Sequence, residues 1–511
     1  KIRILGAGLA GTEAAYQLAE RGHTVELWEM RPAKMTPAHQ TSNLAELVCS
    51  NSFRSSAVTN AVGLLKHEMN LLGSLVTRCG EQARVPAGDA FAVDRERFSA
   101  AVTGAIESSS VVIRREEATS LDRGDADFLV VATGPLTSHP LFEAINEFLG
   151  RDGLYFYDAI APIVAADSLD MSKLYWKSRY DKGSGTDYLN APMTREQYEA
   201  FIAALLAAEL YPLHDFEKAV HFEGCLPAEE IASRGIDTLR FGPMKPVGLE
   251  HPVTGERPWA VVQLRKEDLS DEHFNLVGFQ TKMKIGDQKR VIRMIPGLEN
   301  CEFARFGSMH RNTFINGPKH LRPTFQTKRD ERIFFAGQVT GVEGYVESAA
   351  VGLLVARYID ELSHGGVARP LPYHTALGAL GRHVAESSPD RYQPSNVTWA
   401  LIEDVVGRAK KTEKRERQVA AARVQAVAEQ GVGPAKVARH ALRIRAGVPF
   451  RPDARRAARW AFAAVDQRLR PLEEQVVHLV ERTAEADAAR IVVVDEDVRL
   501  GGERLGNVRC A

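Results

Sequence analysis

The first thirty residues constrain the fold most strongly. They read as an apolar strand, a glycine-rich turn, an amphipathic helix and a second apolar strand, in the sequence IRILGAGLAGTEAAYQLAERGHTVELWEMR. Gly6, Gly8 and Gly11 have the GxGxxG spacing, in which the glycines permit a tight turn, a close approach of a pyrophosphate and close helix–strand packing. Glu29 ends the second strand, where a carboxylate can accept hydrogen bonds from a ribose. This order predicts a Rossmann-type unit that binds a dinucleotide.

Two later segments indicate that the dinucleotide is FAD rather than NAD. The apolar run DFLVV ends in Ala132, Thr133 and Gly134, a pattern with which flavoproteins bring a second backbone turn against the cofactor. The run RIFFA continues through Gly337 and Gln338 into a glycine-rich loop that opens a helix, whose N-terminal N–H groups can face a flavin. No second intact GxGxxG occurs, so we expect a nicotinamide reductant to visit the flavin only transiently.

The length of 511 residues predicts two or three domains. The predicted fold class is α/β: a doubly wound Rossmann-type FAD-binding domain with an inserted α+β domain and a helical C-terminal extension. The insertion contains the helical pattern TREQYEAFIAALLAAEL and the strand-like runs PWAVVQLRKED and FNLVGFQT. The predicted segments are 1–140 with 318–365 for the FAD domain, 141–317 for the inserted substrate domain, 366–430 for a helical part, and 431–511 for a basic, mostly helical extension of unknown role.

The formal net charge of -1 does not point to a polyanionic partner, so the distribution of charge has to be considered. Between about residues 408 and 460, roughly fifteen Lys and Arg stand against about four Asp and Glu, an excess that attracts a phosphate backbone. Solvated helix faces would have the same composition, and both interpretations stay open.

The five cysteines are scattered without CxxC spacing, at positions 49, 79, 225, 301 and 510. This argues against a zinc ribbon, a dithiol redox pair and a secreted disulfide framework. We therefore predict no metal site and a reducing, cytoplasmic environment. The chain opens on a strand, and no apolar run approaches the roughly 18 residues of a membrane span, so we expect a soluble protein.

Two of the cysteines have a setting that favours reactivity. Cys49 lies in LAELVCSNSFRSS among Ser, Asn and Arg, and Cys225 lies in HFEGCLPAEEIASRG, just before a helix N-terminus. A partly exposed thiol near cationic or helix-terminal groups becomes a nucleophile, whereas a cysteine buried in an apolar run is inert. We therefore predict functional thiols at Cys49 and Cys225, and structural roles for Cys79, Cys301 and Cys510.

Several long motifs together resemble one family. They are GAGLAGTEAAYQLAERGHTVELWEMRP, TSNLAELVCSNSFRS, HFEGCLPAEEIASRG, FGPMKPVGL, GSMHRNTFIN and FAGQVTGVEGYVESAA. They look like those of the folate- and FAD-dependent tRNA (uracil-5-)-methyltransferases (TrmFO), the short relatives of the GidA/MnmG proteins, and the resemblance ends near residue 430. It implies an enzyme that forms 5-methyluridine in the T-loop of tRNA, with methylenetetrahydrofolate as one-carbon donor and FAD reduced by NAD(P)H.

The resemblance also assigns residues of this sequence to roles. It implies that Cys49 and Cys225 are catalytic. It implies that the FAD-binding residues are Gly6, Gly8, Gly11, Glu29, Ala132, Thr133, Gly134, Gly337, Gln338 and Tyr345. It places His310 and Tyr345 near the flavin and the folate, and Arg311 beside His310 is a further candidate for contact with the folate or the substrate. Arg311 with Lys282 or Lys284 could hold the folate glutamate tail or an RNA phosphate, or could form a solvated basic face.

Two thiols and a reduced flavin suit the methylation of uracil. Carbon 5 becomes nucleophilic when a thiolate adds to carbon 6, a second group must remove the proton on carbon 5, and a hydride must reduce the resulting methylene. A uridine inside a folded T-loop has to be extruded to reach the flavin. Which cysteine adds to uracil, and whether NADH or NADPH is preferred, stay open.

Two alternatives remain. One is a GidA/MnmG-type flavoprotein that modifies the wobble uridine of tRNA, and the other is a non-catalytic flavoprotein that binds RNA. We expect tRNA and small-molecule folate and nicotinamide as partners, no membrane, and no obligate protein partner.

Overall fold

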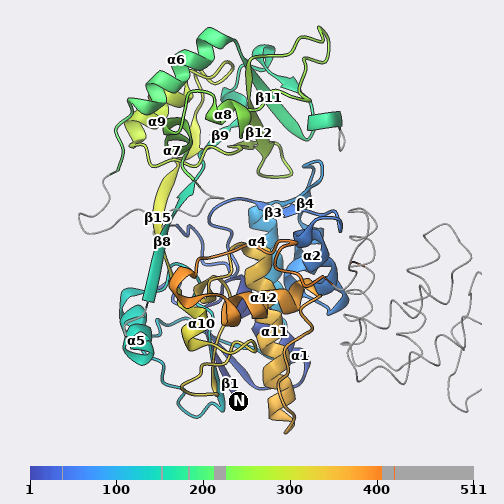
Figure 1. Cartoon of the computed structure of the whole chain (residues 1–511), viewed down its shortest axis with the longest axis vertical. Coiled ribbons are helices and arrows are strands. Elements are labelled where there is room, and N and C mark those ends of the chain that lie inside the picture. The colour runs from blue at the N-terminus through green and yellow to red at the C-terminus, as the bar shows by residue number, and fades with distance from the viewer. Residues whose placement is uncertain (37, 151–152, 182–184, 212–225, 405–418, 420–511) are drawn as a thin grey trace, which may run out of the picture. The chain divides into compact units, whose positions relative to one another are not determined.

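The computed structural model describes residues 1–404 and 419, apart from 37, 151–152, 182–184 and 212–225 (Figure 1). For 153–159 and 309–311 only the backbone is described. The predicted extension 431–511 and the basic stretch 408–460 lie outside the described residues, except for Val419. Contacts divide the chain into two compact units, the first formed by Lys1–Ser56, Leu75–Ala368 and Val384–Asn396, and the second by Ala57–Ser74, Arg369–His383 and Val397–Ala511.

The first unit contains a five-stranded parallel sheet, ordered β16-β7-β1-β2-β6. Its strands are β1 (Ile2–Leu5), β2 (Val25–Trp28), β6 (Val112–Arg114), β7 (Phe128–Val131) and β16 (Ile333–Phe335). The central strands are mostly apolar because a parallel sheet is covered on both faces. Leu5 pairs with both Trp28 and Val131, so the carboxyl ends of three strands align at one edge. The predicted α/β class is confirmed.

Helices α1 (Leu9–Glu20) and α11 (Tyr345–Ser363) pack against each other (Figure 1). A buried carboxylate on α1 fixes the start of α3 (Leu75–Gln82), because Glu13 accepts hydrogen bonds from the N–H groups of Leu75 and Val76 at 3.0 and 2.9 Å. This contact satisfies two of the N–H groups that a helix N-terminus leaves without intrahelical partners. Helix α4 (Arg95–Glu107) is capped in the ordinary way by the side chain of Asp94.

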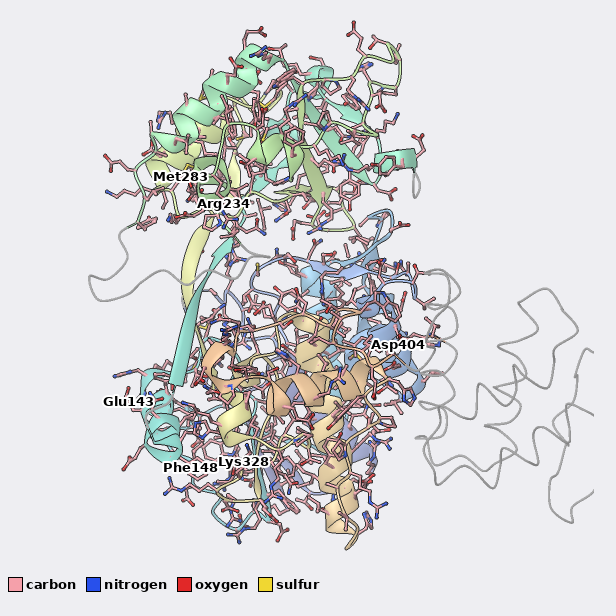
Figure 2. The ribbon with its side chains drawn as sticks, viewed as in Figure 1. Glu143, Phe148, Arg234, Met283, Lys328 and Asp404 are labelled. Carbon is pink, nitrogen blue, oxygen red and sulfur yellow. The ribbon has the colours of Figure 1, made fainter. Side chains whose placement is uncertain are left out.

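Helix α5 (His139–Leu149) shows how spacing decides burial in this unit. Leu141, Ile145 and Leu149 recur every four residues and are buried, whereas Glu143 points to solvent (Figure 2). The helix ends at Gly150, whose φ is +79°.

A small antiparallel sheet, ordered β3-β5-β4, follows Cys49 in the sequence. Its strands are β3 (Ser52–Ser55), β4 (Arg84–Val85) and β5 (Ala90–Val93). Phe53 of β3 packs edge-on against Phe91 and Phe98, with ring centroids 5.4 and 5.3 Å apart. This aromatic cluster fixes β3 and thereby the residues just before it.

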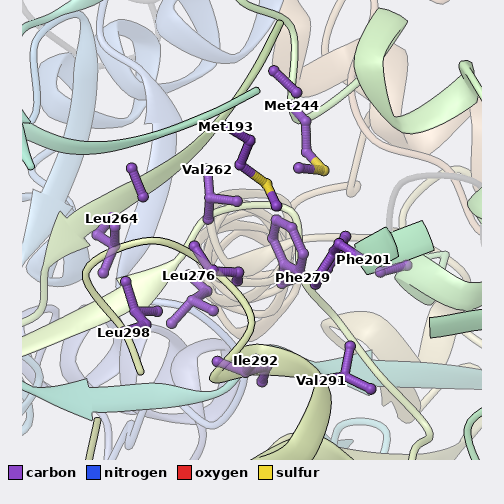
Figure 3. Close-up of a cluster of buried hydrophobic side chains, with 14 of the residues drawn as sticks. Met193, Phe201, Met244, Val262, Leu264, Leu276, Phe279, Val291, Ile292 and Leu298 are labelled. Carbon is purple, nitrogen blue, oxygen red and sulfur yellow. The ribbon is translucent and has the colours of Figure 1, made fainter. Parts of the chain in front are cut away.

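The described residues of the inserted part contain a six-stranded sheet, ordered β10-β11-β12-β13-β9-β14, with four helices. Its elements are β9 (Ile163–Ala165), β10 (Tyr175–Trp176), β11 (Tyr188–Met193), α6 (Arg195–Leu206), α7 (Ala228–Ser233), α8 (Thr238–Phe241), β12 (Ala260–Lys266), β13 (His273–Leu276), α9 (Ile285–Ile292) and β14 (Phe303–Arg305). Thr194 and Gln197 form a capping box that starts α6. Figure 3 shows the buried side chains that the sheet and helices share, including Met193, Phe201 and Leu264.

Two longer strands precede and follow this sheet in the chain. β8 (Gly153–Ile160) and β15 (Ser308–Ile315) form an antiparallel ribbon that pairs Ser308 with Ile160 and Ile315 with Gly153. The ribbon carries the chain into the insertion and back toward the parallel sheet, which β16 completes. The short elements of the first unit are η1 (Ala166–Ser168), η2 (Met171–Lys173), η3 (Arg179–Asp181), α10 (Gly317–His320), η5 (Gln338–Thr340) and η6 (Pro389–Arg391).

The second unit contains α2 (Ala61–Leu71) and the part of α12 (Ala376–Glu386) up to His383. Glu68 of α2 is fully buried and accepts hydrogen bonds from the N–H groups of Ala376 and Leu377, both at 2.9 Å. Burial raises the pKa of Glu68 to about 8. The region predicted as helical, 366–430, is less regular than expected, because Ser387–Asp404 contains only one short 3-10 turn among its described residues. Pro389 and Pro394 in this stretch disfavour a continuous helix.

Among the helices in the described part of the chain, none combines the length and the apolar character needed to cross a bilayer.

Candidate functional site

The glycine-rich turn joins β1 to α1 at the carboxyl edge of the parallel sheet. Gly6 has a φ of +96°, a conformation that favours glycine. A Cβ at Gly6 would lie 2.6 Å from the carbonyl oxygen of Ala132, and a Cβ at Gly11 would lie 1.8 Å from the carbonyl oxygen of Gly6. A Cβ at Gly8, the N-cap of α1, would meet no atom within 4 Å. The turn is therefore tightly packed on the protein side and open at Gly8, as a pyrophosphate cradle requires.

A cavity lies against this turn, near the point where the strand order reverses between β1 and β7. Ligands of open α/β sheets bind at such a position. All but one of the residues predicted to hold FAD line the cavity, and the exception, Gly11, lies inside α1. The lining residues from the prediction are Gly6, Gly8, Glu29, Ala132, Thr133, Gly134, Gly337, Gln338 and Tyr345.

Glu29 is buried, and its carboxylate is held from two sides. Oε1 accepts hydrogen bonds from the backbone N–H and from Nε of Arg31, at 3.0 and 2.9 Å, and Oε2 accepts from the backbone N–H of Ala7 at 3.1 Å. Burial opposes ionisation, but the hydrogen bonds and the charge of Arg31 lower the pKa of Glu29 below its usual value. Because a carboxylate offers about four acceptor positions, the ionised group retains capacity for a ribose hydroxyl.

Four polar or charged residues of the loop after β2 also line the cavity, although the sequence patterns did not indicate them: Arg31, Thr36, His39 and Glu46. Nη1 of Arg31 lies 3.1 Å from Oε2 of Glu46, so one guanidinium joins two carboxylates. Burial and the charge of Arg31 lower the pKa of His39 to about 4, so its imidazole is neutral at pH 7. For Arg31 the sequence did contain a signal. Arg31 stands two positions after Glu29, and side chains two apart on an extended segment share a face.

The N-terminus of α11 also lies at this cavity, through Tyr345 and Ser348. The hydroxyl oxygen of Tyr345 accepts hydrogen bonds from the N–H of Cys49 at 2.7 Å and from the N–H of Ser50 at 3.1 Å. Burial raises the pKa of Tyr345, so the phenol is neutral. Tyr345 therefore joins the cavity wall to the backbone of the Cys49 loop.

Cys49 is a half-buried thiol whose backbone is bonded on both sides. Its N–H donates to Tyr345, and its carbonyl oxygen accepts a hydrogen bond from Arg95 at 3.1 Å. Cys225 lies outside the described residues, so the joint action of the two thiols stays a prediction. Cys79 and Cys301 are buried, and burial raises the pKa of both thiols, a setting in which cysteine is unreactive.

The remaining predicted residues lie on or near the inserted part. On β15, the backbone of His310 pairs with Asp158 and that of Arg311 with Tyr157, while both side chains lie outside the description. Lys282 is buried and contacts Glu230, so it belongs to a structural ion pair. Lys284 is exposed and lies 2.8 Å from Glu209, at the surface.

The residues around the cavity fit FAD. The N-termini of α1 and α11 supply N–H groups for the cofactor's polar atoms, and Glu29 supplies an acceptor for a ribose. The backbone of Cys49 is bonded to this wall through Tyr345, although Cys49 itself is not among the residues that line the cavity. The arrangement can thus hold a dinucleotide, and one hydrogen-bonded contact separates its wall from the Cys49 backbone.

One cluster of the described residues has side chains of metal-binding type: His23, Asp360 and His364, whose ligand atoms lie within 4.8 Å of one another. Nε2 of His23 lies 2.7 Å from Oδ1 of Asp360, and Nε of Arg21 lies 3.6 Å from Oδ2 of the same carboxylate. A cation already faces Asp360, so these contacts account for the cluster as a hydrogen-bond network.

The family model and the similar proteins that match this chain agree with one another. The family described as "Glucose inhibited division protein A" (GIDA) matches residues 1–366. The chain is 52% identical over 420 residues to "Methylenetetrahydrofolate--tRNA-(uracil-5-)-methyltransferase TrmFO" of Bacillus subtilis, covering 82% of this chain and 96% of that protein. It is 55% identical over 417 residues to the protein of the same name from Geobacter sulfurreducens, covering 81% and 95%.

Among solved structures, the chain resembles Aquifex aeolicus GidA in its form II crystal, with a TM-score of 0.60 and 15% identity, over 98% of this chain and 79% of that one. The form I crystal gives a TM-score of 0.59 over 96% and 91%. These two structures support the fold.

Proposed function

Because the chain belongs to the GidA family and, within it, to the methylenetetrahydrofolate–tRNA-(uracil-5-)-methyltransferases (TrmFO), we propose that it forms 5-methyluridine in the T-loop of tRNA. Methylenetetrahydrofolate is the one-carbon donor, and FAD is the bound cofactor. NADH or NADPH would be the reductant and would bind only transiently, since the sequence has no second dinucleotide fingerprint. No protein partner is required, and the reaction takes place in the cytoplasm.

The position of Cys49 carries this proposal. Its backbone N–H is bonded to Tyr345, a residue of the cavity wall that fits FAD. A nucleophilic thiol beside a flavin is what uracil methylation needs, because carbon 5 of uracil reacts with an electrophile only after a nucleophile has added to carbon 6.

The residues of this chain have distinct tasks in such a reaction. One thiol, Cys49 or Cys225, adds to carbon 6 of the extruded uracil, and the other serves as base or handles the methylene carrier. Glu29 and the helix N-termini hold the cofactor, and Tyr345 orients the Cys49 loop. When bound and reduced, FAD would supply the hydride that turns the methylene into a methyl group. The base reaches the site by leaving its stack, and phosphate contacts and RNA shape guide recognition.

The decisive experiment is nucleoside analysis of unmodified tRNA after incubation with the holoenzyme, methylenetetrahydrofolate and NADPH. We expect 5-methyluridine from the wild-type protein and from Cys79→Ala, whose thiol is buried away from the cavity. We expect none from Cys49→Ala or Cys225→Ala. If the wild-type protein with bound FAD makes no 5-methyluridine, the proposed function is refuted.

Substrate variants separate the alternatives. A tRNA with the T-loop uridine replaced by cytidine should lose the product, whereas replacement of the wobble uridine should not change it. The opposite result favours the wobble-modifying class. RNA binding without any modified nucleoside, unaffected by either cysteine substitution, favours a non-catalytic flavoprotein.

A further inference from the structure

The loop that carries Cys49 is bonded to the end of β12 as well as to Tyr345. Asn51 is fully buried, and its Nδ2 donates a hydrogen bond to the carbonyl oxygen of Lys266 at 2.9 Å. Its Oδ1 accepts one from Nε of Arg265 at 3.1 Å. Asn51 and Lys266 are 215 positions apart, so a strand of the inserted sheet fixes a residue two positions after the thiol.

Arg95, the first residue of α4, holds the other side of the loop. Its Nε donates to Oε2 of Glu267 at 2.6 Å, Nη1 donates to the carbonyl oxygen of Leu47 at 2.8 Å, and Nη2 donates to the carbonyl oxygen of Cys49 at 3.1 Å. All three nitrogens of one planar guanidinium are engaged. The single ammonium of a lysine does not reproduce this geometry.

The Arg95–Glu267 pair is poorly suited to a purely stabilising role. The two side chains are 15% and 5% exposed, so both charges have lost most of their hydration. Oε1 of Glu267 is buried with no hydrogen-bond partner among the described residues, which costs about 1–3 kcal/mol. Burial opposes the charge of Arg95, but the carboxylate of Glu267 raises its pKa, so the guanidinium stays charged. These costs point to a role in positioning.

We propose that Asn51, Arg95, Arg265 and Glu267, here called the β12 anchor, position the Cys49 thiol for its reaction with uracil. This inference rests on the catalytic role of Cys49 proposed above. Tyr345 fixes the N–H of Cys49 and Arg95 fixes its carbonyl group, which leaves the side-chain torsion as the main freedom of the thiol. Because Arg265 and Glu267 come from the insertion, the reactive position of Cys49 depends on that part of the chain too. The four anchor residues are positioning residues.

The substitution Arg95→Lys tests this role, because it keeps the charge opposite Glu267 and removes the three-point geometry. Two readouts on the FAD-loaded enzyme are needed: the kcat and KM of tRNA methylation, and the rate at which iodoacetamide alkylates Cys49, followed by peptide mass spectrometry. We expect kcat to fall by about tenfold to a hundredfold, because small misplacements of reacting groups have effects of this size. The KM for tRNA should stay within about twofold. Alkylation should become about tenfold faster, since weaker backbone contacts let the loop open more often.

Arg97→Lys is the matched control. Arg97 lies two residues later on α4 with its side chain 67% exposed, and its substitution should change neither readout. Glu267→Gln keeps the shape of the anchor and weakens one charge-assisted hydrogen bond. Its kcat and its alkylation rate should lie between those of the wild type and those of Arg95→Lys. It replaces Arg95→Lys as the test if that variant does not fold.

The readouts also separate the two proposals. An Arg95→Lys enzyme that folds and matches the wild type in alkylation, or in methylation, overturns the positioning role. If Arg95→Lys does not fold, a wild-type kcat or a wild-type alkylation rate in Glu267→Gln overturns the positioning role. If the wild-type protein makes no 5-methyluridine, the proposed function fails, and an unchanged alkylation rate would then reject the anchor independently.

Discussion

Replacing Glu68 by glutamine should flatten the dependence of stability on pH. Glu68 is fully buried between α2 and the start of α12, and burial raises its pKa from 4.5 to about 8. A raised pKa means that the native state holds a proton that the unfolded chain releases. The stabilising effect is therefore complete below about pH 4.5 and is lost as the pH rises toward 8.

The size of the effect follows from the same numbers. Each pH unit within this window lowers the free energy of unfolding by about 1.4 kcal/mol, so the whole window amounts to about 5 kcal/mol. Glutamine carries no proton to lose, so this loss is absent from the variant. Its amide offers one acceptor oxygen where Ala376 and Leu377 present two N–H groups, a pH-independent cost of about 1–3 kcal/mol. The Glu68→Gln protein should be less stable than the wild type near pH 5 and more stable near pH 8.

The assay is the midpoint of thermal unfolding of both proteins, each with bound FAD, from pH 5 to pH 8.5. The difference between the two curves isolates Glu68, because all other titrating groups are shared. Glu20→Gln, an exposed substitution on α1, should run parallel to the wild type. If the Glu68→Gln curve also runs parallel to the wild-type curve, Glu68 is ionised in the native protein and the reasoning is wrong.

Three further substitutions test the cofactor site. Gly11→Ala should abolish FAD retention, measured by the flavin absorbance of the purified protein, because the new Cβ would lie 1.8 Å from the carbonyl oxygen of Gly6. Arg31→Ala leaves two carboxylates facing a cavity without their cation and should cost about 3–5 kcal/mol in unfolding free energy, whereas Lys34→Ala, at an exposed ion pair, should cost less than about 1 kcal/mol. Tyr345→Phe removes the acceptor of two backbone N–H groups and should lower the methylation kcat by about tenfold with FAD still bound; an unchanged kcat would contradict the orienting role of Tyr345.

The parts of the fold that follow local rules were predictable from the sequence. The GxGxxG turn is encoded by its own glycines. The strands before Ala132 and Gly337 are continuous apolar runs, which is typical of strands buried on both faces of a parallel sheet. The nucleotide residues taken from these motifs meet at one cavity, since strands of a parallel sheet end at the same edge.

What the sequence did not reveal depends on contacts between distant segments. His39 lies in a polar loop without periodicity, so nothing in its neighbourhood indicated the cavity. The bonds from Arg95 and Asn51 to the end of β12 join positions more than 170 apart, which no local pattern encodes. Ser387–Asp404 lies in the region 366–430 that was predicted to be helical, and its two prolines disfavour a continuous helix there.

Helix α11 offers a position for a spectroscopic label far from the cofactor site. It has 19 residues, so it extends roughly 28 Å from Tyr345 to its C-terminus, where His364 is exposed. A spin label or fluorophore attached there, through His364→Cys, would report movements of the cofactor-side helix during turnover without touching the chemistry. Paired with a second label on the insertion, it would measure how the separation of the two changes when tRNA arrives.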